Sequence, residues 1–172
     1  MRAHRSRSFL LRHTALLAGL FAIAPLQAEP IRRTPLPGSN FPLSLAVSVP
    51  ARHTLVFLSG ALPEPIDGGA PKSATANYGD TRQQTLSVLH RFEALLRAEG
   101  LGFGDVVQAR VYLVADPASG QVDYAGFNAA YAQYFGSAEQ PAKPARTAVQ
   151  VAGLAWPGAL VEIELTAARA EP

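Results

Sequence analysis

Apolar and polar residues alternate along five stretches of the chain, a pattern that predicts half-buried β-strands. The stretches are SLAVSV (44–49), HTLVFLSG (53–60), DVVQARVYLVAD (105–116), TAVQV (147–151) and VEIEL (161–165). Alternation with a period of two places successive side chains on opposite faces of a sheet. Only Pro-Ala-Arg separates the first two stretches, so we expect them to pair with each other as a hairpin.

Two other segments show apolar residues every three or four positions, which predicts helices. Asp80 is a suitable N-cap for the first helix, and Gly100 stands where a glycine commonly ends one. The apolar face of this helix would consist of Leu86, Leu89, Phe92, Leu95 and Leu96. The second helix is expected over 122–135, with Phe127, Tyr131, Tyr134 and Phe135 on its inner side. The order ββαβαββ predicts an α+β fold with two helices on one face of a sheet.

Residues 1–28 have the layout of a secretory signal peptide. Four arginines lead into the apolar run TALLAGLFAIAPL, which closes on LQA before Glu29. This run is shorter than the ~20 residues that a membrane-spanning helix needs. We therefore expect cleavage and a periplasmic or secreted protein that is free of the membrane, with a retained anchor as the alternative. Residues 29–43, rich in proline and polar groups, are expected to form an extended leader before a single domain over 44–170.

Removal of the signal peptide would change the charge of the protein. The signal holds four of the 15 Lys and Arg residues and none of the 13 Asp and Glu residues, which leaves 11 − 13 = −2. No run of basic residues remains, so we expect no nucleic-acid partner. The chain has no cysteine, which excludes disulfides and thiolate chemistry. His53 and His90 are far apart in the sequence, and no metal site is expected.

Charged residues accompany the two C-terminal strands. Arg146 precedes TAVQV and has the opposite parity from Thr147 and Val149. Glu162 and Glu164 lie two residues apart in VEIEL and should point the same way. Taken alone, Arg146 is most simply interpreted as an exposed charge at the start of a strand, and Glu162 and Glu164 as charges on a solvated sheet face. A binding site is the alternative interpretation.

The order of several segments resembles that of the RidA (YjgF) family. The segments are VFLSG, QTLSVLHRFEALLRAEGLGFGDVVQARVYLVAD, FNAAYAQYF, PARTAVQVAGL and VEIELTA, and the resemblance extends from about Phe41 to Ala168. It implies a chorismate-mutase-like (YjgF-like) α+β subunit and a homotrimer with clefts between neighbours. It further implies hydrolysis of 2-imino or enamine acids to 2-keto acids and ammonia, without a metal or an organic cofactor.

The resemblance also implies roles for individual residues. Arg146 would bind the substrate carboxylate through paired hydrogen bonds, and Glu162 would orient and activate water. Ser59, Gly60 and Asn128 would line the pocket. Arg146 and Glu162 would also neutralise one another in a dry cleft.

Three features differ from the family pattern. Leu43 stands where many deaminating members carry a tyrosine, and Ala148 stands where a thiol or similar small residue is usual. The loop GLAWPGAL is slightly longer than in compact members and contains Trp156, the only tryptophan of the chain. Leu43 would make the pocket wall more apolar. The alternative function is therefore a trimeric module that binds a small carboxylate or another protein without turnover.

Overall fold

The computed structural model describes residues 29–73 and 76–171; the predicted signal peptide, residues 1–28, lies outside the described residues. The elements are β1 (Arg32–Pro35), β2 (Ser44–Ser48), β3 (His53–Ala61), α1 (Thr81–Ala98), a 3₁₀ turn η1 (Phe103–Asp105), β4 (Val106–Leu113), α2 (Tyr124–Tyr131), β5 (Ala145–Gln150) and β6 (Val161–Ala170). Neither α-helix in this part of the chain is long and apolar enough to cross a membrane.

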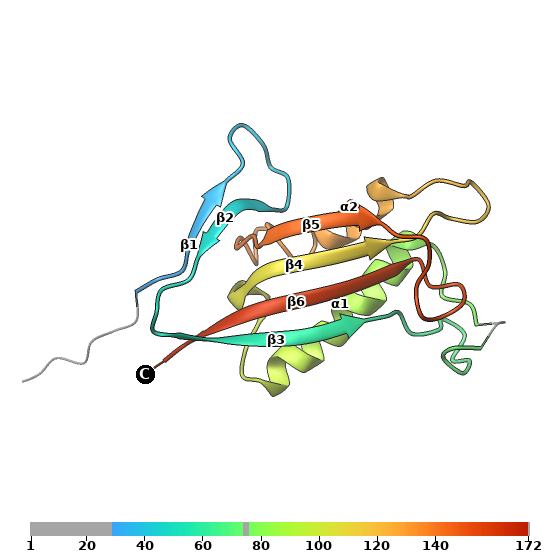
Figure 1. Cartoon of the computed structure of the whole chain (residues 1–172), viewed down its shortest axis with the longest axis horizontal. Coiled ribbons are helices and arrows are strands. Elements are labelled where there is room, and N and C mark those ends of the chain that lie inside the picture. The colour runs from blue at the N-terminus through green and yellow to red at the C-terminus, as the bar shows by residue number, and fades with distance from the viewer. Residues whose placement is uncertain (1–28, 74–75, 172) are drawn as a thin grey trace, which may run out of the picture.

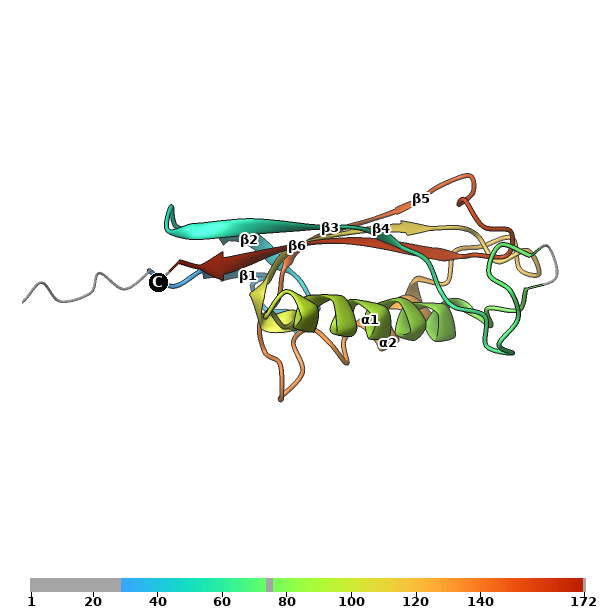
Figure 2. The same ribbon diagram turned by 90° about the horizontal axis from the view of Figure 1, so that it is seen from below.

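Six strands form one mixed sheet, and both α-helices pack on the same face of it. The strand order is β1-β2-β5-β4-β6-β3, with β4 parallel to β5 and antiparallel to β6. Figure 1 looks onto the helix-free face, and Figure 2 shows α1 and α2 together on the other side. The predicted α+β class, with two helices on one face, is confirmed.

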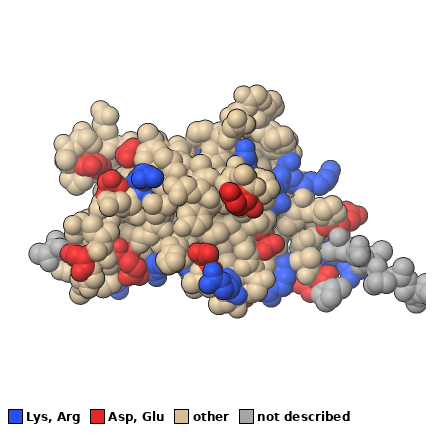
Figure 3. Space-filling view, turned by 180° about the vertical axis from the view of Figure 1, so that it is seen from behind, with Lys and Arg blue, Asp and Glu red and all other residues tan. Residues whose placement is uncertain are grey.

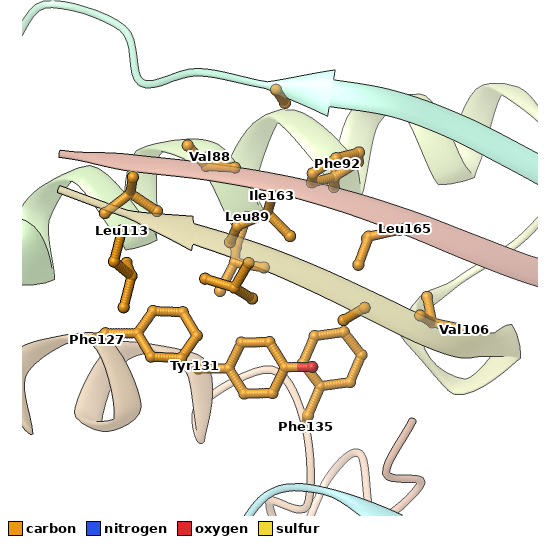
Figure 4. Close-up of a cluster of buried hydrophobic side chains, with 14 of the residues drawn as sticks. Val88, Leu89, Phe92, Val106, Leu113, Phe127, Tyr131, Phe135, Ile163 and Leu165 are labelled. Carbon is orange, nitrogen blue, oxygen red and sulfur yellow. The ribbon is translucent and has the colours of Figure 1, made fainter. Parts of the chain in front are cut away.

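The core lies between this sheet and the two helices (Figure 4). The inward-facing residues of β4 and β6 are at most 2% exposed: Ala109, Val111, Leu113, Val161, Ile163 and Leu165. The predicted inner residues of α2 and the turn after it pack here, with Tyr131 stacked on Phe135 at 4.5 Å between ring centroids. Burying such apolar surface contributes ~25 cal/mol per Å². This layer therefore fixes which strand residues are left on the opposite face.

Both ends of α1 agree with the prediction. Asp80 accepts a hydrogen bond from the backbone nitrogen of Gln83 at 2.7 Å, and its own backbone nitrogen donates to the Gln83 side chain at 3.0 Å. This reciprocal pair is a capping box. Gly100 has φ of 69°, which favours glycine after a helix. Leu95, predicted to face inward, is instead 47% exposed, because the buried stripe of α1 passes through Gln84, Thr85 and Val88.

The predicted hairpin between 44–49 and 53–60 does not form. β2 pairs with β1 along its length and with β5 through Ser44 and Ala145, whereas β3 lies at the other edge of the sheet. There β3 pairs antiparallel with β6, from His53 opposite Ala170 to Ala61 opposite Ile163. The long partner β6 offers the nine-residue β3 more ladder bonds than the five-residue β2 could provide. Alternation predicted both strands correctly but not their partners.

The segment 29–43 is more than the predicted extended leader, because its residues Arg32–Pro35 form strand β1. This strand pairs with β2 at the edge of the sheet, where a proline does not interrupt the ladder. The Nη2 atom of Arg33 donates to the carbonyl oxygens of Gly104 and Val106 at 2.8 and 3.2 Å. These bonds fasten the N-terminal segment to the start of β4.

The loop that contains Trp156 is tied to the start of α1 by a buried glutamine. The Nε2 atom of Gln84 donates to the carbonyl oxygens of Gly79 and Gly158 at 3.0 and 3.1 Å. Its Oε1 accepts from the backbone nitrogen of Leu160 at 2.7 Å. Trp156 stacks on Tyr78 with 6.3 Å between the ring centroids. The loop thus enters β6 in a fixed position, just before Glu162.

Candidate functional site

Arg146 lies on the helix-covered face of β5, surrounded by aromatic rings. It pairs in register with Ala109 of β4, which is fully buried. Its guanidinium carbon lies 5.0, 5.2 and 4.7 Å from the ring centroids of Phe41, Phe127 and Tyr131. Such cation–π contacts contribute ~0.5–2 kcal/mol each, more when water is excluded. The charge is therefore held by ring faces.

No acidic side chain in the described part of the protein pairs with this guanidinium. Arg146 takes part in none of the ion pairs there, and its buried Nη1 atom has no hydrogen-bond partner. Burial disfavours the charge and lowers the pKa of Arg146, while the neighbouring Tyr131 opposes that shift. A buried cation without an anion is energetically costly. The arrangement suits an anion that arrives with a ligand.

Asn128 and Ala148, two predicted site residues, share the helix side of the sheet with Arg146. Asn128 belongs to α2, which also supplies two of the three rings around the guanidinium. Its Nδ2 donates to the carbonyl oxygen of Tyr124 at 2.7 Å, and its buried Oδ1 has no hydrogen-bond partner in the described part of the chain. Ala148 follows Arg146 by two positions on β5 and faces the same way.

Leu43 lies next to the segment that enters β5. The following residue, Ser44, donates from its backbone nitrogen to the carbonyl oxygen of Pro144 at 2.8 Å and from its hydroxyl to that of Lys143 at 2.7 Å. These bonds bring the chain around Leu43 beside the Pro-Ala-Arg sequence. The backbone of Leu43 thus lies close to the Arg146 half of the predicted site.

Figure 3 shows acidic and basic side chains interspersed over the helix side of the protein, with no broad patch of one sign. The unpaired Arg146 is consequently a local feature of one end of β5. Long-range attraction by a charged surface would contribute little there, because opposite charges at short spacing cancel beyond a Debye length of ~8–10 Å. Recognition of an anion would depend on direct contact with the guanidinium.

Glu162 lies on the other, helix-free face of the sheet. Val161, Ile163 and Leu165 of β6 point into the core, so Glu162 and Glu164 point away from it. Glu162 pairs in register with Tyr112 of β4. Partial burial, and then the negative charge of Glu164, raise the pKa of Glu162 above its usual range. This carboxyl group therefore holds its proton to higher pH than an ordinary glutamate.

Ser59 and Gly60 form a bulge in β3 beside these carboxylates. Leu58 pairs with Leu165 and Ala61 with Ile163, so the two intervening residues face one residue of β6, Glu164. Such bulges are common next to active sites. A Cβ atom at Gly60 would lie 2.1 Å from Oε1 of Glu162. Glycine at this position leaves the space that the Glu162 carboxylate occupies.

The structure thus divides the predicted site residues into two groups. Arg146, Asn128, Ala148 and Leu43 belong to the helix side, whereas Glu162 lies on the helix-free face against the Ser59–Gly60 bulge. Within one subunit the sheet itself separates Arg146 from Glu162. The mutual neutralisation that the sequence suggested does not occur inside a single chain.

The described residues contain no group of three or more His, Cys, Asp or Glu side chains that could hold a metal ion. A groove of about 280 Å³ does run along the helix-free face, and Ser59, Gly60, Arg110 and Glu164 contribute to its lining. Its polar groups converge near the carboxyl end of β3. The groove is large enough for a small organic acid and open on one side.

The family model for Endoribonuclease L-PSP matches residues 38–169, which include every predicted site residue. The chain belongs to the YjgF/RidA family. It is similar to two RutC family proteins. The one from Pyrococcus horikoshii is 38% identical over 112 residues, 65% of this chain and 77% of the relative. The one from Pyrococcus abyssi is 34% identical over 126 residues, 73% of this chain and 85% of the relative.

Solved structures of YjgF/RidA proteins share the fold. A Rid-family protein from Yersinia pestis matches with a TM-score of 0.60 at 27% identity, covering 80% of this chain and 97% of that one. TdcF from Escherichia coli, solved with bound serine, matches with a TM-score of 0.53 at 28% identity, covering 77% of this chain and 96% of that one. The predicted family and its YjgF-like fold are confirmed.

Four residues of this YjgF/RidA protein were not predicted as site residues, and Tyr131 was expected only on the inner side of the second helix. Phe41 and Tyr131 form part of the aromatic surround of Arg146, and Arg110 and Tyr112 bind Glu164 on the helix-free face. Parity along 105–116 does place Arg110 and Tyr112 on one face. No local signal could reveal that this face meets the carboxylates of β6, because the pairing joins residues more than 50 positions apart.

Replacement of Gly60 by alanine should displace the Glu162 carboxylate while the fold persists. The new Cβ atom overlaps Oε1, and the half-buried glutamate can rotate away, so the loss of stability should stay within ~1 kcal/mol. A crystal structure and a urea unfolding curve of the variant would measure both effects. Gly102→Ala is the matched control, because its Cβ would meet no atom within 4 Å. A carboxylate in its wild-type position in Gly60→Ala would contradict this account.

Proposed function

We propose that the protein hydrolyses small 2-imino acids, or their enamine tautomers, to 2-keto acids and ammonia in a cleft between subunits. The observation that carries this proposal is the buried Nη1 of Arg146, which has no partner in the described residues. The two oxygens of a carboxylate lie in one plane and can accept two parallel hydrogen bonds from a guanidinium. The bound serine of TdcF, another small molecule with a carboxylate, supports a ligand of this class.

The separation of Arg146 and Glu162 supports a site built from two subunits. Because one chain directs them to opposite faces of its sheet, a single ligand can meet both only if each comes from a different copy. The helix-free face exposes Leu55, Phe57 and Val149 by 45, 74 and 41%, and apolar side chains that gather on one exposed face are typical of a protein contact surface. Contact with neighbouring subunits would cover them. A homotrimer, as the family resemblance implies, would provide three such clefts.

The chemistry assigned to this cleft needs water and a group that moves protons. Arg146 would bind the substrate carboxylate and orient the adjacent iminium carbon. Glu162, once ionised, would take a proton from water as the oxygen bonds to that carbon and the C=N π electrons move to nitrogen. The proton then passes to the nitrogen, and the C–N bond breaks as the new hydroxyl group gives its proton to the departing ammonia, so that iminium plus water become keto acid plus ammonium. The raised pKa of Glu162 suits a group that both accepts and returns a proton.

A trimeric module that binds a small carboxylate without turnover is the second candidate. Leu43 favours it, because this residue brings no hydroxyl group to the Arg146 half of the cleft. Both candidates use Arg146 in the same way. They differ in whether Glu162 handles a proton, and this difference determines the experiments that separate them.

Replacement of Arg146 and of Glu162 should impair different steps. Arg146→Ala should weaken binding of a keto acid such as pyruvate by ~2–5 kcal/mol, because a charge-assisted contact is lost. Glu162→Gln preserves the shape of the side chain but removes its proton exchange, so pyruvate affinity should persist while turnover falls ~100-fold or more. Calorimetric titration measures the first effect. Ammonia release from enzymatically generated imines, with semicarbazide competition, measures the second.

Arg82, which is exposed, and Glu93, which is half-buried and paired with Arg97, provide matched controls on α1. Arg82→Ala and Glu93→Gln make the same chemical changes away from both halves of the site and should alter neither binding nor turnover. If Glu162→Gln binds pyruvate and turns over as fast as the wild type, the binding module replaces the enzyme as the better account. Normal pyruvate affinity in Arg146→Ala would contradict both candidates.

Mixed trimers should recover activity from two inactive variants. If Arg146 of one subunit works with Glu162 of its neighbour, Arg146→Ala and Glu162→Gln chains refolded together will rebuild some intact clefts. Random mixing in equal amounts restores about a quarter of the clefts in a cyclic trimer, and a similar share of wild-type turnover. Light scattering should give the mass of three chains before and after mixing. Trimers that mix yet stay inactive would contradict a cleft shared between subunits.

We further propose that the protein is exported and that its mature chain begins near Glu29. The basis is the order of arginines, apolar run and LQA in residues 1–28. N-terminal sequencing of the protein recovered from a periplasmic or extracellular fraction should therefore start at or close to Glu29. Recovery of chains that still begin with Met1 would contradict this expectation.

A further inference from the structure

We propose that Arg110, Tyr112 and Glu164 are positioning residues of the reaction. Arg110 and Tyr112 hold the carboxylate of Glu164 in a fixed place beside Glu162. This inference rests on the proposed function and adds residues that the scheme above does not use. It concerns the helix-free face of the sheet, where β4 and β6 run side by side (Figure 1).

Both oxygens of Glu164 are occupied by partners from β4. The Nη1 atom of Arg110 lies 3.3 Å from Oε2 of Glu164, and the hydroxyl of Tyr112 donates to Oε1 at 3.3 Å. The backbone register sets this geometry, since Arg110 pairs with Glu164 and Tyr112 pairs with Glu162. Glu164 is thereby held at two points, and its charge stays where the strand places it.

The Glu162 side chain takes part in none of the ion pairs or hydrogen bonds of the described residues. Its backbone takes part only in the pairing of β6 with its neighbours. Its titratable and charged neighbours on this face are Glu164 on its own strand and Arg110 and Tyr112 on β4. The third element, β3, contributes the Ser59–Gly60 bulge, which has no titratable group. Glu162 is consequently free to exchange a proton with a ligand.

A fixed carboxylate beside Glu162 makes its ionisation harder. Side chains two residues apart on a strand project from Cα atoms ~7 Å apart, close enough for like charges to interact across a half-buried face. Burial and Glu164 together raise the pKa of Glu162, and Arg110 tempers the negative charge of Glu164. Tyr112 keeps its own proton, because burial and Glu164 raise its pKa, and so remains a donor to Glu164. The trio thus controls the pH at which Glu162 can accept a proton from water.

The test is the pH dependence of turnover in charge variants with opposite signs. Turnover should fall as the pH drops through the pKa of Glu162, because the protonated carboxyl cannot accept a proton. Glu164→Gln removes a neighbouring negative charge, so this acidic limb should move to lower pH. Arg110→Gln removes the positive charge that tempers Glu164, so the limb should move to higher pH. Tyr112→Phe frees one oxygen of Glu164 and tests the hydrogen bond without a change of charge.

A merely structural role would lower turnover at every pH and leave the limb in place. Glu93→Gln, the same chemical change on α1, should keep both the plateau and the limb of the wild type. Plateau turnover in Glu164→Gln should remain well above that of Glu162→Gln, because Glu162 is intact. Limbs that coincide in wild type, Glu164→Gln and Arg110→Gln would overturn the inference.

A titration of the Glu162 carboxyl carbon by ¹³C NMR gives a readout that needs no substrate. The resonance is assigned by its loss in Glu162→Gln, and its midpoint should fall in Glu164→Gln and rise in Arg110→Gln. If the titration midpoints move as expected but the protein releases no ammonia, the proposed hydrolysis is wrong and the electrostatic coupling is correct. An active protein whose midpoint is the same in all three chains would defeat the inference and leave the proposed function intact.

Discussion

The alternation of β6 is the constraint on which the candidate site depends. Val161, Ile163 and Leu165 are buried against the helices, and the pleat of the strand then leaves Glu162 and Glu164 on the opposite face. A shift of register by one residue would bury two carboxylates and expose three core side chains. The hydrophobic core therefore positions the carboxylates without contacting them. β4 repeats the pattern and brings Tyr112 and Arg110 beside them.

Each half of the candidate site contains groups that lower the stability of the folded chain, and the groups differ between the two halves. On the helix side, the Nη1 atom of Arg146, the Oδ1 atom of Asn128 and the hydroxyl of Tyr131 are buried without hydrogen-bond partners among the described residues. On the helix-free face, two carboxylates stand on one strand. Groups of this kind reduce the stability of a folded chain and are commonly found where a ligand will satisfy them. In the proposed trimer, their presence on opposite faces would connect ligand binding to subunit association.

Small residues and backbone irregularities complete the arrangement on the helix-free face. The Ser59–Gly60 bulge lets β3 remain paired with β6 on both sides of Glu164 while the glycine leaves room for the Glu162 side chain. At the other end, Gln84 fixes the loop that leads into β6. These features act on the backbone, so they determine the position of the Glu162 Cα atom rather than the contacts of its side chain.

The sequence by itself determined most of the elements and the α+β class, and it indicated the candidate residues of the site. Local periodicity and capping are properties of neighbouring residues, which is why Asp80, Gly100 and the alternation of VEIEL could be interpreted without a structure. The tertiary structure decided which strands pair. It placed β3 beside β6, added β1 from the presumed leader, and showed Arg146 and Glu162 on opposite faces. It also brought Phe41 against Arg146 and Tyr112 against Glu164. These contacts join residues dozens of positions apart, and their energies depend on competition among all strands for the same partners, which no local pattern records.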